Sequence, residues 1–152
     1  IQKVLDRYPY DNNGVIRRKL FFSRASIYVS GEKISFDDLE HGQIRPVYQE
    51  PRVHFALNCA SVSCPPLLDR AFDGATLDAD LTKVTRQFLN ENPDGVKLGD
   101  DGNTAYISML FSWFAEEFGD SKTFINKFRD QKLKKSTKLE YQEYDWRRNE
   151  AE

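Results

Sequence analysis

Residues 51–67 gather the side chains best suited to chemistry. This segment contains His54, one of two histidines in the chain, and both cysteines, Cys59 and Cys64. A cysteine attacks a substrate as the thiolate, which forms readily only near a base, a cation or a helix N-terminus. The segment therefore indicates a functional site without specifying a reaction.

The two cysteines allow three interpretations. A disulfide between Cys59 and Cys64 would enclose four residues and add at most a few kcal/mol, because short loops hold little entropy. As metal ligands, these cysteines with His54 and His41 lack the usual zinc spacings, so we expect no metal and no cofactor. As nucleophiles, Cys59 is the first candidate and Cys64 the second.

The local pattern predicts how the cysteines are presented. Residues 53–57 are expected to form a buried strand, because β-branched and aromatic residues follow one another in a run too short for a helix. Alternation along it places His54 and Asn58 on the face opposite Cys59. Pro65 and Pro66 then predict a tight turn that holds both cysteines.

The second histidine is expected on a short helix that Ser35 begins and that stops before Pro46. Glu40 could orient His41 as a general base, although a Glu–His pair on a helix is more often structural. We expect this helix to meet the end of the 53–57 strand in a cleft, where Asn58 and turn amides could bind an oxyanion. The candidate catalytic residues are Cys59, Cys64, His41, His54, Glu40 and Asn58.

Motifs in order along the chain carry a family resemblance. They are His-Phe-Ala-Leu-Asn-Cys at 54–59, Ser-Cys-Pro-Pro-Leu at 63–67, the Glu-His and Arg of segment 35–45, the expected helix at 77–89, and Tyr-Asp-Trp-Arg-Arg-Asn at 144–149. Over residues 10–150 they resemble the domain-of-unknown-function family 547 of bacteria, plants and nematodes. That family has an upstream segment of the form Phe-Trp-Ile-Asn-x-Tyr-Asn, which this sequence lacks, so we expect a trimmed chain.

The resemblance implies no particular reaction. It implies export, as in many bacterial members of the family, and so a periplasmic or secreted protein in which Cys59 and Cys64 are oxidised to each other. It also makes the missing upstream segment, or a protein partner, a candidate for binding this chain.

Composition narrows the classes further. At 152 residues and 39% hydrophobic content the chain is expected to form one domain, with eleven phenylalanines supplying much of its core. A net charge of −2 provides no field that would attract nucleic acid, and the lysines of the 131–138 connection suit a solvated linker. No run is long and apolar enough to span a membrane.

The remaining elements follow from periodicity and turn signals. We expect an α+β domain in which helices pack on a small, mostly antiparallel sheet. Its elements are a hairpin over 20–34 with Gly31 at positive φ, a helix over 77–90 capped by Thr76, a hairpin over 96–107, a buried helix over 108–118, a helix over 122–133 and a last strand over 139–146.

Two functions are compatible with these residues. The leading hypothesis is a non-catalytic interaction or scaffold domain with a structural Cys59–Cys64 turn. The alternative is a cysteine-dependent acyl-transfer or hydrolase enzyme of papain-like or transglutaminase-like type.

Overall fold

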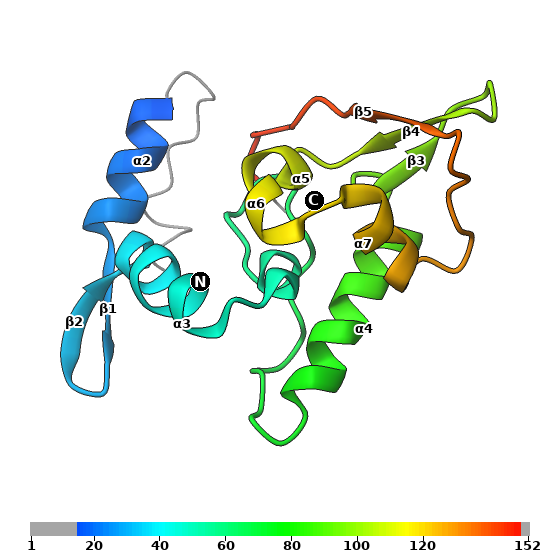
Figure 1. Ribbon diagram of the computed structural model, residues 1–152. Helices are drawn as coiled ribbons and strands as arrows, with labels where there is room; N and C mark the ends of the chain where they lie inside the picture. The colour runs from blue at the N-terminus through cyan, green and yellow to red at the C-terminus, as the bar shows by residue number, and fades with distance from the viewer. Residues whose placement is uncertain (1–14, 150–152) are drawn as a thin grey trace. The chain divides into compact units, whose positions relative to one another are not determined.

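The computed structural model describes residues 15–149, which form two compact parts (Figure 1). The first comprises residues 15–50 with 146–149, and the second comprises residues 51–145. Both contain helices and strands, so the predicted α+β class is confirmed. The single domain over residues 1–152 stays a prediction.

The first part begins with a helix and a hairpin. Helix α2 (Val15–Arg24) leads into strands β1 (Ser26–Val29) and β2 (Glu32–Ser35), which pair antiparallel. Ser30 and Gly31 at the tip have φ of 52° and 86°, as a two-residue type I′ turn requires. The hairpin and the positive φ of Gly31 are confirmed, but its first arm is shorter than predicted because residues 20–24 are helical.

A π-helix, η1 (Asp38–Ile44), follows the hairpin. Its start is held by Ser35, whose Oγ accepts a hydrogen bond from the Asp38 backbone N–H at 3.0 Å. The Ser35 hydroxyl also donates to the Asp38 carboxylate at 2.7 Å. The predicted start of this helix at Ser35 is confirmed, and the Asp38 carboxylate binds the Ser35 hydroxyl and not a backbone amide.

The sequence predicted that this helical segment stops before Pro46, and that prediction is wrong. The segment continues into α3 (Arg45–Tyr48), in which Pro46 occupies the first turn. Pro46 directly follows the change from the π-helix to the α-helix, where the backbone hydrogen-bond pattern is already altered. Gln49, with φ of 46°, ends the segment.

The second part opens with a 3-10 helix, η2 (Pro51–Phe55), where a strand over 53–57 was predicted. The strand prediction is wrong. Val53 O accepts hydrogen bonds from the N–H groups of Ala56 and Leu57 at 2.9 and 3.0 Å, so the backbone is satisfied locally and not in a sheet. A short apolar run is compatible with either structure, and Pro51 favours the helical start.

Helix α4 (Leu77–Asn90) has the predicted bounds. Its apolar face, with Val84 and Phe88, enters the core as the helical spacing predicted. Asp80, a charged residue of this helix, is buried. There it accepts hydrogen bonds from Arg70 at 2.6 Å and from the Thr76 hydroxyl at 2.7 Å, so Thr76 binds this side chain and does not cap the helix with its own.

The hydrogen bond from Arg70, followed by that from Thr76, lowers the pKa of the Asp80 carboxyl below its ordinary value. The charged form of Asp80 is therefore the form that the fold stabilises.

A three-stranded sheet lies in the second part, with β3 (Val96–Leu98), β4 (Thr104–Ile107) and β5 (Lys138–Tyr141) side by side in that order (Figure 1). Strands β3 and β4 form the predicted antiparallel hairpin. Strand β5 pairs parallel to β4 and ends at Tyr141, five residues earlier than predicted. The small sheet that we expected is thus two separate sheets, one in each part of the chain.

Between β4 and β5 run three short helices, α5 (Leu110–Trp113), α6 (Ala115–Phe118) and α7 (Ser121–Phe128). The helix predicted over 108–118 is broken at Phe114, whose φ and ψ of −117° and 31° are not helical. Gly119 ends α6 at a φ of 63°, as predicted. The helix predicted to reach residue 133 ends at Phe128.

Phenylalanine rings form much of the core of the second part. Phe55, Phe88 and Phe111 are fully buried, and the ring of Phe111 lies 4.7 Å from that of Phe118. Tilted and edge-to-face contacts of this kind suit aromatic rings better than face-to-face stacking. The predicted contribution of large rings to the core is confirmed.

The basic connection over 131–138 is held by lysine ammonium groups bound to backbone carbonyls. Lys122 donates to Lys135 O at 2.8 Å and to Thr137 O at 2.6 Å, and Lys132 donates to Arg129 O at 2.6 Å.

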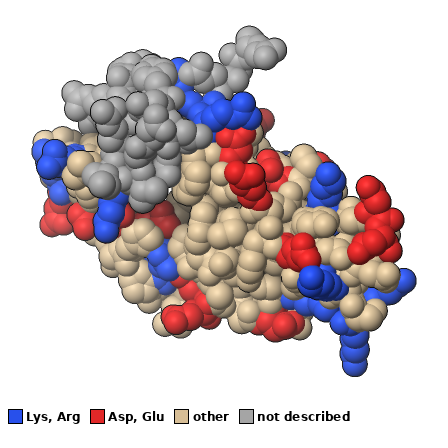
Figure 2. All heavy atoms as spheres, turned by 90° about the horizontal axis from the view of Figure 1, so that it is seen from above, with Lys and Arg blue, Asp and Glu red and all other residues tan. Residues whose placement is uncertain are grey.

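On the face that Figure 2 shows, acidic and basic side chains stand near one another, and neither sign covers a continuous area. None of the helices over residues 15–149 is long and apolar enough to cross a membrane.

Candidate functional site

The cysteine loop follows η2 directly. Cys59 and Cys64 form a disulfide, with their Cα atoms 6.4 Å apart, a separation that disulfides commonly have. Both cysteines of the chain are consumed by this bond. Of the three interpretations that the sequence left open, the structure has the disulfide, and neither sulfur is a thiol.

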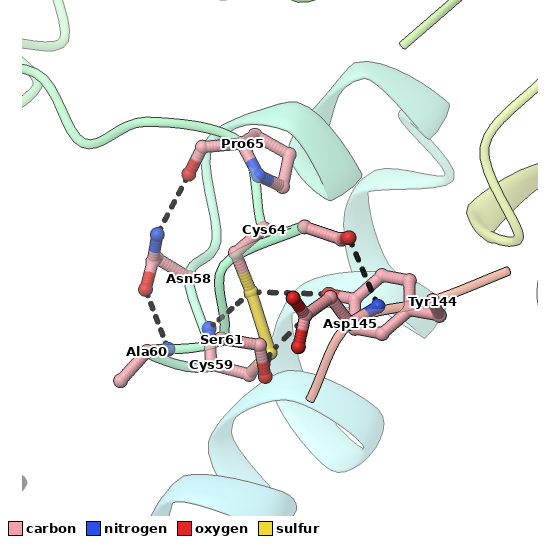
Figure 3. Close-up of a disulfide and its surroundings, with 9 residues drawn as sticks. Asn58, Cys59, Ala60, Ser61, Cys64, Pro65, Tyr144 and Asp145 are labelled. Carbon is pink, nitrogen blue, oxygen red and sulfur yellow. Dashed lines mark hydrogen bonds between the residues drawn. A yellow bond between two sulfur atoms is a disulfide. The ribbon is translucent and has the colours of Figure 1, made fainter. Parts of the chain in front are cut away.

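Asn58 braces the loop across the disulfide (Figure 3). Its carboxamide oxygen accepts from the Ala60 N–H at 2.6 Å, and its Nδ2 donates to Pro65 O at 2.7 Å. The first of these bonds holds Ala60 at a φ of 64°, a left-handed backbone that alanine seldom adopts. Both ends of the amide are thus engaged in bracing the loop.

A segment after β5 closes over the disulfide. The Tyr144 hydroxyl lies 3.2 Å from Cys64 Sγ and 3.5 Å from Cys59 Sγ. The Asp145 N–H donates to Ser63 Oγ at 3.0 Å, and the Ser63 N–H donates to Asp145 O at 3.3 Å. Residues about eighty positions apart in sequence are therefore joined at the loop.

Two of these contacts were missed from the sequence. The sequence shows Tyr144 only as part of the closing motif and Ser63 only as part of the cysteine motif. Nothing in the local pattern of either segment indicates that they meet. The signal that could have linked them is their common membership in one family resemblance.

His54 lies in the core and not on an open strand. It is 3% exposed, its ring stacks on Phe114 with centroids 3.7 Å apart, and its Nε2 lies 2.9 Å from a carboxylate oxygen of Glu117. The predicted face alternation with Cys59 fails, since residues 51–55 are helical. This environment is that of a histidine packed in the fold, and a catalytic role for His54 stays a prediction.

His41 lies in η1 and is exposed. Its Nε2 is 3.6 Å from Asp37 Oδ1, and its Nδ1 accepts a hydrogen bond from Arg45. Glu40 and His41 belong to the first part of the chain and the cysteines to the second, so the predicted cleft between them stays a prediction. The same holds for their catalytic roles.

The described part of the chain contains no cluster of side chains suited to binding a metal ion. Over residues 15–149, no three His, Cys, Asp or Glu side chains are grouped so that they could hold an ion.

Comparison with known families gives one match. The family described as "Protein of unknown function, DUF547" matches residues 1–89, more than half of the chain. This chain belongs to that family. The match includes η1, η2 and the whole disulfide loop, while Tyr144 and Asp145 lie outside it. The search of curated proteins and the search of solved structures each gave no match.

Proposed function

We propose that this chain is a non-catalytic interaction or scaffold domain in which the Cys59–Cys64 disulfide fixes a surface loop. The observation that carries the proposal is the bond itself, because a cysteine in a disulfide has no thiolate with which to attack a substrate. The bond instead closes a loop that two other segments hold in place.

The surroundings of the disulfide support a structural role. Asn58 braces the loop from within, and the Ser63–Asp145 pair ties it to the segment after β5. The loop presents Val62 and Leu67 to solvent, at 38% and 55% exposure. A binding loop that is rigid before it meets a partner loses less entropy on binding.

The surroundings of His54 support the same proposal. Its ring is buried against Phe114, and its Nε2 lies 2.9 Å from a carboxylate oxygen of Glu117, so it is engaged in the packing of the fold.

The alternative, a cysteine-dependent acyl-transfer or hydrolase enzyme, requires the reduced protein. One observation favours it: Cys59 is partly exposed, and its sulfur lies beside the hydroxyl groups of Ser61 and Tyr144. Cys59 would then be the nucleophile, with His41 or His54 as its base.

A thiol assay tests the proposal. The protein purified without reductant should show no free thiol, native or in denaturant, and two after reduction. The reduced protein should hydrolyse p-nitrophenyl acetate no faster than the Cys59→Ser/Cys64→Ser double variant. In the reduced protein, the rate at which iodoacetamide alkylates Cys59 is followed against pH. This rate should be the same in His41→Ala and His54→Gln as in the parent chain.

Two results would instead support the enzyme. One is ester hydrolysis that is lost in Cys59→Ser. The other is an alkylation profile for Cys59 that moves to higher pH when His41 or His54 is replaced, because a histidine partner lowers the pKa of the thiol it activates.

A further inference from the structure

The two sulfur atoms are surrounded by hydrogen-bond donors. The Cys59 N–H donates to Cys64 Sγ at 3.0 Å, and the Tyr144 hydroxyl lies 3.2 Å from the same atom (Figure 3). Ser61 Oγ lies 3.2 Å from Cys59 Sγ. Since a disulfide sulfur carries no hydrogen, the hydroxyl groups must be the donors.

Donors in these positions favour breaking of the bond. Sulfur in a disulfide is a weak acceptor, whereas a thiolate is a strong one, so each donor gains more from the thiolate than from the disulfide. Stabilising the departing thiolate also speeds exchange, because a thiol of lower pKa leaves faster. Cys64 Sγ has both an N–H and a hydroxyl donor.

The two cysteines also differ in access. Cys59 is partly exposed, whereas Cys64 is 4% exposed. An incoming thiol can therefore reach Cys59 more easily, and the sulfur that would leave is the one with the backbone N–H donor and the shorter contact to the Tyr144 hydroxyl.

We propose that the Cys59–Cys64 disulfide exchanges with dithiol reductants, with Cys59 as the sulfur attacked and Cys64 as the leaving thiolate. This proposal rests on the disulfide on which the proposed function also rests, and it adds a reaction to it.

The exchange takes two steps. A thiolate of the dithiol bonds to Cys59 Sγ, the bond between the cysteines breaks, and its electron pair goes to Cys64 Sγ. The second thiol of the reductant then attacks the mixed disulfide and releases Cys59. The reductant becomes a cyclic disulfide, and its two electrons and two protons end on the two cysteines.

The first experiment measures the rate of reduction. The oxidised chain is mixed with dithiothreitol, quenched with acid and alkylated, and the reduced fraction is followed with time, in buffer and in concentrated urea. We expect native protein to be reduced at least as fast as unfolded protein. A native rate more than about tenfold below the unfolded rate would mean that the fold protects the bond, and would overturn the proposal.

The second experiment removes one donor. Tyr144→Phe keeps the ring that lies 4.8 Å from Trp113 but deletes the hydroxyl. Tyr141→Phe, on an exposed residue of β5, is the matched control. We expect Tyr144→Phe to shift the reduction equilibrium toward the disulfide by about three- to tenfold, the upper value corresponding to about 30 mV. Equal shifts in both variants would overturn the role of the hydroxyl in the proposal.

The third experiment locates the attack. A monothiol such as glutathione is reacted with the oxidised chain, and the acid-quenched mixed disulfide is fragmented by mass spectrometry. The adduct is expected on Cys59 with Cys64 free, and an adduct mainly on Cys64 would contradict the proposed direction.

Failure of this proposal is distinct from failure of the proposed function. A disulfide that is present but inert in the native protein refutes exchange and leaves the structural role intact. Two free thiols in the protein purified without reductant remove the structural disulfide itself.

Discussion

Two neighbouring regions of residues 51–145 are held together in different ways. The aromatic core around Phe55, Phe88 and Phe111 is fully buried and held by packing of rings. The disulfide loop is partly exposed and held by one covalent bond and by hydrogen bonds of Asn58 and Ser63. The core should therefore respond to loss of volume, and the loop to loss of single polar groups or to a change of redox state.

This difference also separates stability from function. Changing a ring that is packed on all sides lowers the stability of the fold, and such a ring exposes no atom to a partner. The loop carries exposed residues and the disulfide. A protein that needs a stable fold and a changeable surface can place them side by side in this way.

The largest effect is expected from the core. Phe111→Ala removes a ring that is 0% exposed and contacts those of Phe55 and Phe118, so it should lower the free energy of unfolding by about 3 to 5 kcal/mol. Urea unfolding followed by circular dichroism measures it. Phe114→Ala, at a partly buried ring, should cost less, and equal losses would contradict the division between core and periphery.

Removal of the disulfide should have an intermediate effect. The Cys59→Ala/Cys64→Ala double variant should lower the free energy of unfolding by about 2 kcal/mol, because so short a loop restricts the unfolded chain only modestly. Reduction of the parent chain should produce a similar loss in the same urea titration. A loss as large as that of Phe111→Ala would show that the core depends on the loop.

A smaller effect is expected at the loop brace. Asn58→Ala leaves the Ala60 N–H and Pro65 O without this partner and should cost about 1 to 2 kcal/mol. Asn103→Ala, at an exposed side chain in the β3–β4 turn, is the control and should cost little. The brace would be unimportant if the two variants unfolded at the same urea concentration.

The smallest effect is a change in pH dependence. The pKa of Asp80 is lowered in the folded protein, chiefly by the hydrogen bond from Arg70, so its stabilisation is present above the unfolded pKa of about 4 and is lost as pH falls through the folded value. Asp80→Asn and Arg70→Gln should each make the loss of stability below about pH 4 less steep. Unfolding followed between about pH 2 and 6 checks this, and an unchanged slope in both variants would contradict it.

Local sequence patterns predicted an element correctly where its hydrogen bonds and its apolar spacing lie within one short segment. The bounds of α4 follow from its helical spacing, and the β3–β4 hairpin follows from two short apolar runs around a glycine-rich turn. Residues 53–57 failed the same reasoning, because a five-residue apolar run suits a strand or a 3-10 helix equally well and Pro51 decided between them. The break at Phe114 also has no local signal.

Long-range polar partners could not be predicted at all. Nothing in the helical pattern of α4 indicates that Arg70 donates a hydrogen bond to Asp80. Arg129 is buried and donates to Leu89 O and Val96 O, and burial lowers the pKa of its guanidinium. A buried charge needs partners, and these come from elements far away in sequence.

By itself, the sequence determined the α+β class and the family, because these depend on periodicity and on motifs within short segments. It left the state of Cys59 and Cys64 open between a disulfide and free thiols, since five residues of separation permit both, while the spacing of the cysteines and histidines argued against a metal site. Only the tertiary structure joined the two sulfurs and brought Tyr144 to them. The physical reason is that sequence spacing limits which atoms can meet, whereas the packing of distant segments decides which of them do.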